Sequence, residues 1–208
     1  TPVTQTTSIA FLLVVPATSP YKTLAELVAA AKAKPEGIKF ASAGIGNQSQ
    51  LAAELLAAAA NVKMLHVPYK GEAPAITDLI GGQVDFIFGT MPALLSQVKT
   101  GKLRALVVGQ PRRSDAVPDV PTTTEAGLPS VVVTGWTGIV APANTPAPVV
   151  KRMHDEIVKI LAMPDVRETL VKAGAEPVGS TPQQFADFIR TETVKWGSAV
   201  KQAGITPE

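Results

Sequence analysis

The 208-residue sequence predicts an α/β fold, in which helices alternate with the parallel strands of a covered sheet. Short runs rich in Val, Ile and Phe recur along the first half of the chain, and alanine-rich runs with helical spacing lie between them. Because a helix between two strands returns the chain to the same end of the sheet, these strands should be parallel. With 46% hydrophobic residues, the chain can bury a sizeable core in one or two domains.

Five strands and four helices are expected in the first half of the chain. Proline or glycine ends most of these runs, and Thr23 with Glu26 forms a capping-box pattern at the first helix. The expected strands are residues 8–16, 38–42, 62–69, 84–89 and 103–109. The expected helices are residues 23–34, 48–60, 73–82 and 91–101.

The amino-acid composition of the chain changes after residue 109. Residues 109–130 are dense in Pro, Thr and charge, which predicts a long surface connection with one helical turn near residues 124–126. Residues 131–142 read as a strand interrupted by Gly135, and two or three helices follow. The first of these helices should open at Thr145, with proline at its first helical position.

Two apolar faces are expected on the C-terminal helices. The first helix has Val149, Met153, Ile157 and Leu161 on one face. The last helix opens at Thr181 and carries a stripe of Phe185, Phe188, Ile189, Trp196 and Val200.

The predicted organisation is a central α/β lobe with flanking segments. The lobe covers residues 16–130, while residues 1–15 and 131–208 enter and leave it. The strands near Ile9 and at residues 131–140 should lie side by side at this crossing. Such a pair is typical of two-lobed binding proteins with a hinge.

Composition narrows the function classes. The net charge of +2 is spread along the chain and forms no basic stripe, so we expect no nucleic-acid partner. Cysteine is absent, which excludes disulfides and thiol chemistry. The two histidines, His66 and His154, are far apart and lack metal-ligand spacing, so no metal is expected. The longest apolar run, residues 9–17, is too short to span a bilayer.

The stretch FASAGIGNQSQLAAEL, residues 40–55, carries the strongest local signal. Gly44 and Gly46 allow close backbone approach, and the helix that follows presents free N–H groups beside Asn47, Gln48 and Ser49. This arrangement suits an anion such as a carboxylate, held without chemistry. The alternative is a turn that needs glycine for steric reasons and caps its own helix with the Asn or Ser side chain.

The same turn partly matches the dinucleotide pattern G-x-G-x-x-G. Ser49 replaces the third glycine, and no carboxylate follows the next strand until Glu72. A nucleotide-binding domain or an α/β enzyme using GIGNQS is therefore the alternative hypothesis, and saturable NAD binding would support it. No nucleophile elbow, catalytic triad or paired carboxylates are visible, so we expect no enzyme.

Other candidate binding residues follow neighbouring strands. Tyr69, Lys70 and Gly71 follow one strand, and Gly89 and Thr90 end another. Because parallel strands share one carboxyl edge, these residues should gather near the glycine turn. A packed aromatic remains the alternative for the tyrosine, and a solvated charge for the lysine.

For most of the remaining candidate residues, a structural or solvated role is expected. Asp85 is expected to be a structural acceptor, His66 a packed histidine, and His154 a solvated one. Trp136 either packs a lobe or lines a cleft. The acidic residues of the long connection, Asp119 and Glu125, are expected to be solvated.

Taken in order, several segments resemble the Bug-type solute-binding proteins of tripartite tricarboxylate transporters, over nearly the whole chain. These segments are TSPYKTLAELVAAAKAKP, FASAGIGNQSQLAAELL, VPYKGEAPAITDLIGGQVDFIF, GKLRALVV, VPTTTEAGLP and GWTGIVAPANTPAPVVKRMHDEIVKIL. The resemblance implies a periplasmic protein of two α/β lobes that closes over a small organic anion. It implies the membrane components of such a transporter as partners, and neither a metal nor an organic cofactor.

The resemblance also implies which residues bind. The second-lobe loop corresponds to residues 42–49, and the strand ends near Tyr69 and Thr90 border the cleft. The full candidate set is Ser42, Ala43, Gly44, Gly46, Asn47, Gln48, Ser49, Tyr69, Gly89 and Thr90.

One departure from the family concerns the N-terminus. Family members carry a signal peptide and a first-lobe segment with a Pro- and Gly-rich turn ending in Thr–Asp, and this chain starts at Thr1 without either. We expect that half of the cleft lies outside the sequence and that the chain alone self-associates or is unstable. A third hypothesis is an interaction domain without a small ligand.

Overall fold

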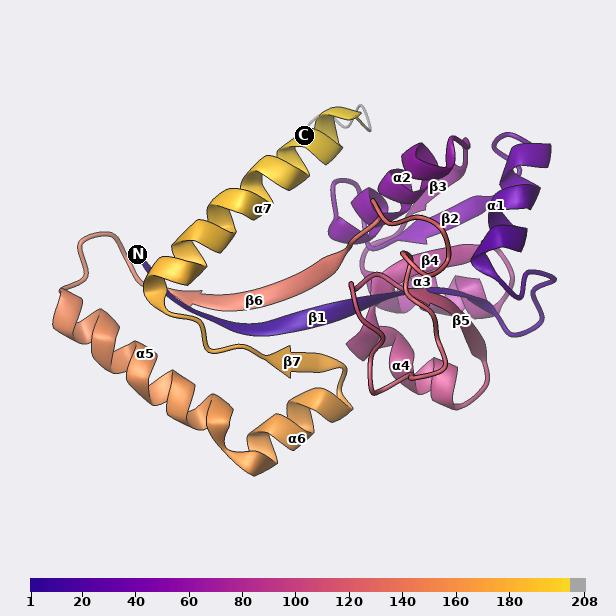
Figure 1. The fold of residues 1–208 in the computed structure, drawn as a ribbon. Helices are drawn as coiled ribbons and strands as arrows, with labels where there is room; N and C mark the ends of the chain where they lie inside the picture. The colour runs from indigo at the N-terminus through magenta and orange to yellow at the C-terminus, as the bar shows by residue number, and fades with distance from the viewer. Residues whose placement is uncertain (203–208) are drawn as a thin grey trace.

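The computed structural model describes residues 1–202 as a seven-stranded mixed sheet flanked by helices (Figure 1). In chain order the elements are β1 (Pro2–Pro16), α1 (Leu24–Ala33), β2 (Lys39–Ser42), α2 (Gln48–Ala60), β3 (Leu65–Pro68), α3 (Glu72–Ile80), β4 (Phe86–Thr90), α4 (Met91–Lys99), β5 (Leu103–Val108), β6 (Thr134–Val140), α5 (Ala147–Ala162), α6 (Pro164–Lys172), β7 (Ala175–Pro177) and α7 (Pro182–Gln202). The predicted α/β class is confirmed.

The second lobe contains the strand order β3-β2-β4-β1-β5. β2 pairs in parallel with both β3 and β4, as predicted. β1 is inserted antiparallel between β4 and β5, so the sheet is mixed rather than wholly parallel. The reason is that β1 enters this lobe from the opposite side instead of returning through a helix.

Side chains of β1 alternate between two buried layers. Phe11 and Leu13 join one hydrophobic cluster, and Leu12 and Val14 join the other. All four side chains are at most 1% exposed. A strand covered on both faces reads as a continuous apolar run, which is why its C-terminal half was visible in the sequence.

The long strand β1 belongs to both parts of the sheet. Its first half pairs with β6 and β7, and its second half pairs with β4 and β5. The predicted pairing of the two crossing strands is therefore confirmed, and Figure 1 shows β1 and β6 running side by side. Residues 2–7 were not predicted as strand because they are rich in Thr and Gln, yet Thr4, Gln5 and Thr7 are buried.

The first-lobe part consists of three helices and the outer portions of β1, β6 and β7. Both α5 and α7 pack against β1. The predicted face of α5 is only partly buried: Met153 and Ile157 pack against a small cluster, while Val149 is 47% exposed. The helix begins two residues after Thr145, whose hydroxyl donates to the Pro142 carbonyl instead of capping the helix.

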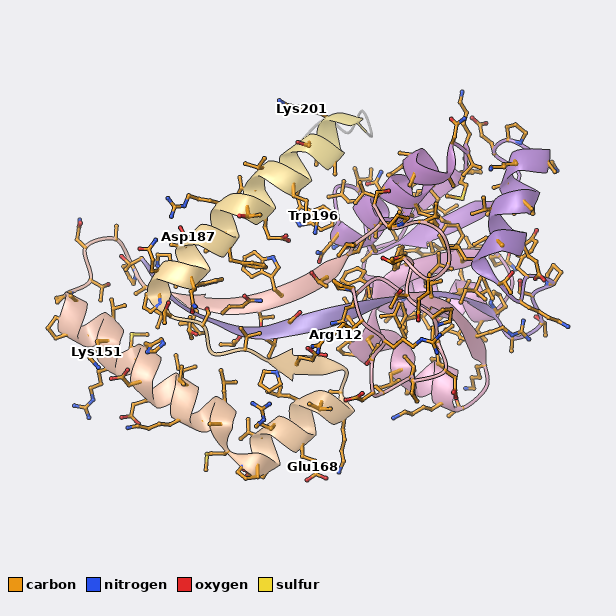
Figure 2. The ribbon with its side chains drawn as sticks, viewed as in Figure 1. Arg112, Lys151, Glu168, Asp187, Trp196 and Lys201 are labelled. Carbon is orange, nitrogen blue, oxygen red and sulfur yellow. The ribbon has the colours of Figure 1, made fainter. Side chains whose placement is uncertain are left out.

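An aromatic cluster fixes α7 on β6. Trp136 meets Phe185 and Phe188 edge-on, at centroid distances of 5.7 and 5.5 Å. This contact favours the packing role of Trp136. Further along the same helix, Trp196 packs against the core of the second lobe, and Figure 2 shows its position on α7. The helix therefore contacts both lobes.

The division of the chain at residues 16 and 130 stays a prediction. The pairing partners of β1 change between Ala10 and Phe11, inside the strand, whereas residue 16 is its last residue. Across residues 1–202, none of the helices combines the length and apolar character that crossing a bilayer requires.

Replacing Gly138 by alanine should destabilise the fold. A methyl group there would overlap Cζ of Phe185, whose side chain is fully buried. We expect a loss of about 1–3 kcal/mol in the free energy of unfolding, measured by urea denaturation. As a matched control, Gly197→Ala adds a methyl group in open space on α7 and should stabilise by up to about 1 kcal/mol. Equal effects of the two changes would contradict the packing described here.

Candidate functional site

The carboxyl ends of β2, β3 and β4 form one edge of the sheet, called here the binding edge. The loop after β3 lies directly against the loop after β2: the amide of Tyr69 donates to the Ser42 carbonyl, and that of Gly71 donates to the Ala43 carbonyl, both at 3.0 Å. The structure thus brings together the residues that the sequence placed at separate strand ends.

The glycine loop, residues 42–49, joins β2 to α2. Gly44 and Gly46 have φ angles of +142° and +72°, which L side chains rarely adopt. Asn47 is the N-cap of α2, and its Oδ1 accepts from the amide of Ser49 at 3.0 Å. The turn therefore does cap its own helix, as the alternative interpretation held.

Several amides of the loop are already bonded within the fold. Ala43 N donates to Ser49 Oγ at 2.9 Å, Gly44 N to Ser42 Oγ at 3.2 Å, and Gly46 N to Gln50 Oε1 at 2.8 Å. The two glycine amides are thus engaged, and the glycines act by shape rather than as donors.

Other donors of the loop remain open. Within residues 1–202, the amides of Ile45 and Gln48 and the Nδ2 of Asn47 have no recorded acceptor. The loop is also accessible, because the side chain of Ile45 is 58% exposed and both Gly46 and Asn47 are exposed. One of these donors, the amide of Gln48, lies at the start of a 13-residue helix, where the helix dipole favours an anion, and the amide of Ile45 lies in the loop that precedes it.

The side chain of Gln48 ties the loop to the crossing strands. Its Nε2 donates to the carbonyl of Thr134, the first residue of β6, at 2.9 Å. The start of α2 is thereby held beside the place where the chain passes between the lobes.

His66 supports the glycine loop from β3. Its Nε2 lies 2.6 Å from Ser42 Oγ, and that hydroxyl donates in turn to the Gly44 carbonyl at 3.1 Å. The ring stacks on Phe40 with centroids 4.9 Å apart. Burial lowers the pKa of this half-buried histidine. The stacking agrees with the packed histidine that the sequence predicts. The contact of His66 with the loop could not be predicted from the sequence.

Tyr69 and Lys70, which are neighbours in the sequence, have different environments. The Tyr69 hydroxyl donates to Asp78 Oδ2 at 2.8 Å, which ties the strand end to α3, and burial followed by this bond raises the pKa of the phenol. Lys70 is exposed.

Gly89 and Thr90 are contacted by Glu72, which was not among the predicted site residues. The Glu72 carboxylate accepts from the amide of Thr90 at 2.9 Å and from its hydroxyl at 2.7 Å. The ligand-binding role of Gly89 and Thr90 stays a prediction, and in this structure the polar groups of Thr90 face an internal carboxylate.

The other polar candidates lie away from the binding edge. Asp85 accepts from the amide of Lys39 at 2.7 Å, which fits its structural reading. The prediction of a solvated His154 was wrong: its side chain is only 19% exposed, and its Nδ1 lies 3.1 Å from Asp155 Oδ1. Glu125 accepts from the amide of Thr122 and pairs with Arg113, and both contacts lower the pKa of its carboxyl.

A cavity with polar lining lies away from the binding edge, between the long connection and α6–β7. There Arg112 reaches Glu176 of β7 at 3.9 Å, and Figure 2 shows the arginine beside that strand. No group of three His, Asp or Glu side chains suited to a metal ion occurs in the part of the chain that the structure describes.

The family profile described as "Tripartite tricarboxylate transporter family receptor" matches residues 1–205. The chain therefore belongs to this family. A curated relative, the UPF0065 protein in the tcbD-tcbE intergenic region of Pseudomonas sp. (strain P51), is 41% identical over 196 residues, 94% of this chain. The chain spans 58% of the length of that relative.

Three solved structures share the fold over at least 96% of this chain. R. palustris Rpa4515 with adipate has a TM-score of 0.92 at 30% identity, and 70% of that chain is covered. The periplasmic binding protein BugD has a TM-score of 0.88 at 31% identity, again with 70% covered. MatC (Rpa3494) from Rhodopseudomonas palustris with bound malate has a TM-score of 0.86 at 33% identity, with 69% covered.

The lowered pKa of His66 predicts an acid-sensitive contribution to stability. A folded-state pKa below the unfolded value of about 6.5 means that the unfolded chain binds the proton more readily. The contribution is fully present above that pH and is lost as the pH falls toward the folded pKa. Between pH 7 and pH 5, wild type should lose more unfolding free energy than His66→Gln, measured by urea denaturation at each pH. Parallel pH profiles would contradict this.

Proposed function

We propose that this chain forms the second lobe and the crossing strands of a periplasmic solute-binding protein that captures a small carboxylate. The captured acid passes unchanged to the membrane components of a tripartite tricarboxylate transporter. The observation that supports this most strongly is the exposed glycine loop. Within the described residues, the amides of Ile45 in the loop and of Gln48 at the start of α2 have no acceptor.

The physical argument favours reversible capture. Backbone N–H groups and the positive end of the helix dipole attract an anion without supplying a charged side chain. The bonds of Ser42, Ser49 and Gln50 hold the loop in one shape, so little ordering is required when an acid binds. Ser42 Oγ lies 2.6 Å from His66 Nε2, but Ser42 is fully buried and its hydroxyl donates to the Gly44 carbonyl. We therefore propose binding without catalysis.

The similar proteins support the ligand class and the compartment. Rpa4515 is known with adipate and MatC with malate, both carboxylates, and BugD is a periplasmic binding protein. We extend the carboxylate class and the periplasmic location to this chain on the strength of its family membership and its open loop.

Gly46→Ala should weaken acid binding more than it weakens the fold. A methyl group at this glycine meets no atom within 4 Å, so it projects into the open space over the loop. We expect about tenfold weaker binding of whichever acid in a panel of adipate, malate, hexanoate and benzoate binds best, measured by calorimetry. The strain of φ near +72° should cost about 1 kcal/mol of stability.

Gly82→Ala is the matched control. Gly82 has a φ angle of +73° and equally open surroundings, but it follows α3 at the opposite end of β4 from the binding edge. It should show the same stability loss and unchanged affinity. If Gly46→Ala and Gly82→Ala bind the acid with equal affinity, the loop is not part of the binding site. Turnover of any acid would favour an enzyme, and saturable NAD binding would favour a nucleotide-binding domain.

A further inference from the structure

An internal carboxylate occupies the start of α4 at the binding edge. Glu72, the first residue of α3, places Oε1 at 2.9 Å from the amide of Thr90 and Oε2 at 2.7 Å from its hydroxyl. Both oxygens therefore act as acceptors. The carboxylate also lies close against Gly89, where an added methyl group would come within 3.0 Å of Oε1.

This carboxylate lies at the N-terminus of α4. Thr90 is the N-cap of that helix and its side chain caps no amide, while its own amide and hydroxyl both donate to Glu72. A carboxylate at a helix N-terminus is stabilised by the helix dipole. The start of α4 thus carries a fixed negative charge, whereas the start of α2 carries none: its cap is the neutral side chain of Asn47 and its first turn contains no acidic residue.

The two helix starts are neighbours. β2 and β4 pair in parallel with Ala41 opposite Ile87, and from there each strand runs to its carboxyl end, β2 to Ser42 and β4 to Thr90. Neighbouring strands lie about 4.8 Å apart. The amide of Gly71, the residue before Glu72, donates to the Ala43 carbonyl at 3.0 Å, which holds the start of α3 against the glycine loop.

We propose that Glu72 determines ligand specificity by filling the second anion position of the binding edge, so that this lobe favours acids with one carboxylate over dicarboxylates of the same length. The inference rests on the proposed function. An acid held by the amides of Ile45 and Gln48 has its first carboxylate on the loop. A second carboxylate at this edge would approach the negative charge of Glu72, and like charges repel each other more strongly where less water lies between them. Selectivity here comes from a repulsive element, not from an added contact.

The test compares acids of equal length that differ by one carboxylate. The pairs are hexanoate and adipate, butyrate and succinate, and benzoate and terephthalate, titrated calorimetrically into the full-length protein. Wild type should bind the monocarboxylate of its preferred pair more tightly. Glu72→Gln keeps the side-chain shape and removes the charge, so it should strengthen dicarboxylate binding on the order of tenfold and change monocarboxylate binding by less than about threefold.

Asp119→Asn is the control for net charge, because Asp119 is an exposed carboxylate in the connection after β5. It should leave the ratio of the two affinities unchanged. A wild-type preference for the dicarboxylate would overturn the proposal, and this measurement needs no variant. If the ratio of monocarboxylate affinity to dicarboxylate affinity differs by less than about threefold between wild type and Glu72→Gln, the proposal is also overturned. If wild type binds no acid of any pair, the proposed carboxylate binding itself fails.

Discussion

The structure depends on the backbone pairing of one strand, β1. In its fifteen residues this strand pairs with β6 and β7 at one end and with β4 and β5 at the other. Phe11 pairs with Thr90 of β4, while its neighbour Ala10 pairs with Thr134 of β6. The binding edge of the second lobe is therefore held next to the strands that lead out of it.

The anion site that we propose at the binding edge consists of neutral groups. The shape of the loop is set by Ser42, Ser49 and Gln50, whose side chains satisfy the amides that do not face outward. His66 holds Ser42 from the next strand. Internal hydrogen bonds thus fix the loop, and within it the amides of Ile45 and Gln48 have no acceptor in the part of the chain that the structure describes.

Much of the fold was predictable from the sequence, because it follows from local patterns. The apolar run at the C-terminal half of β1 and the alanine-rich helices have clear periods, and Thr23 caps α1 as its pattern indicates. β7 was missed because a three-residue strand has no period of its own. The polar N-terminal half of β1 was missed because α5 and α7 bury it, which only tertiary packing reveals.

The candidate site was predictable in its position but not in its internal contacts. The sequence located the glycine turn and the neighbouring strand ends, because parallel strands share one carboxyl edge. The bonds of His66 to Ser42 and of Glu72 to Thr90 join residues 24 and 18 positions apart, and no local pattern indicates such pairs. The engaged amides of both glycines were likewise invisible, because they depend on side-chain orientations in the folded loop.

We propose that the amides of Ile45 and Gln48 hold a ligand carboxylate. A crystal structure of the full-length protein with its best-binding acid would test this directly. Carboxylate oxygens should lie at about 2.7–3.2 Å from both nitrogens. An acid bound elsewhere, with these two amides facing only water, would contradict it.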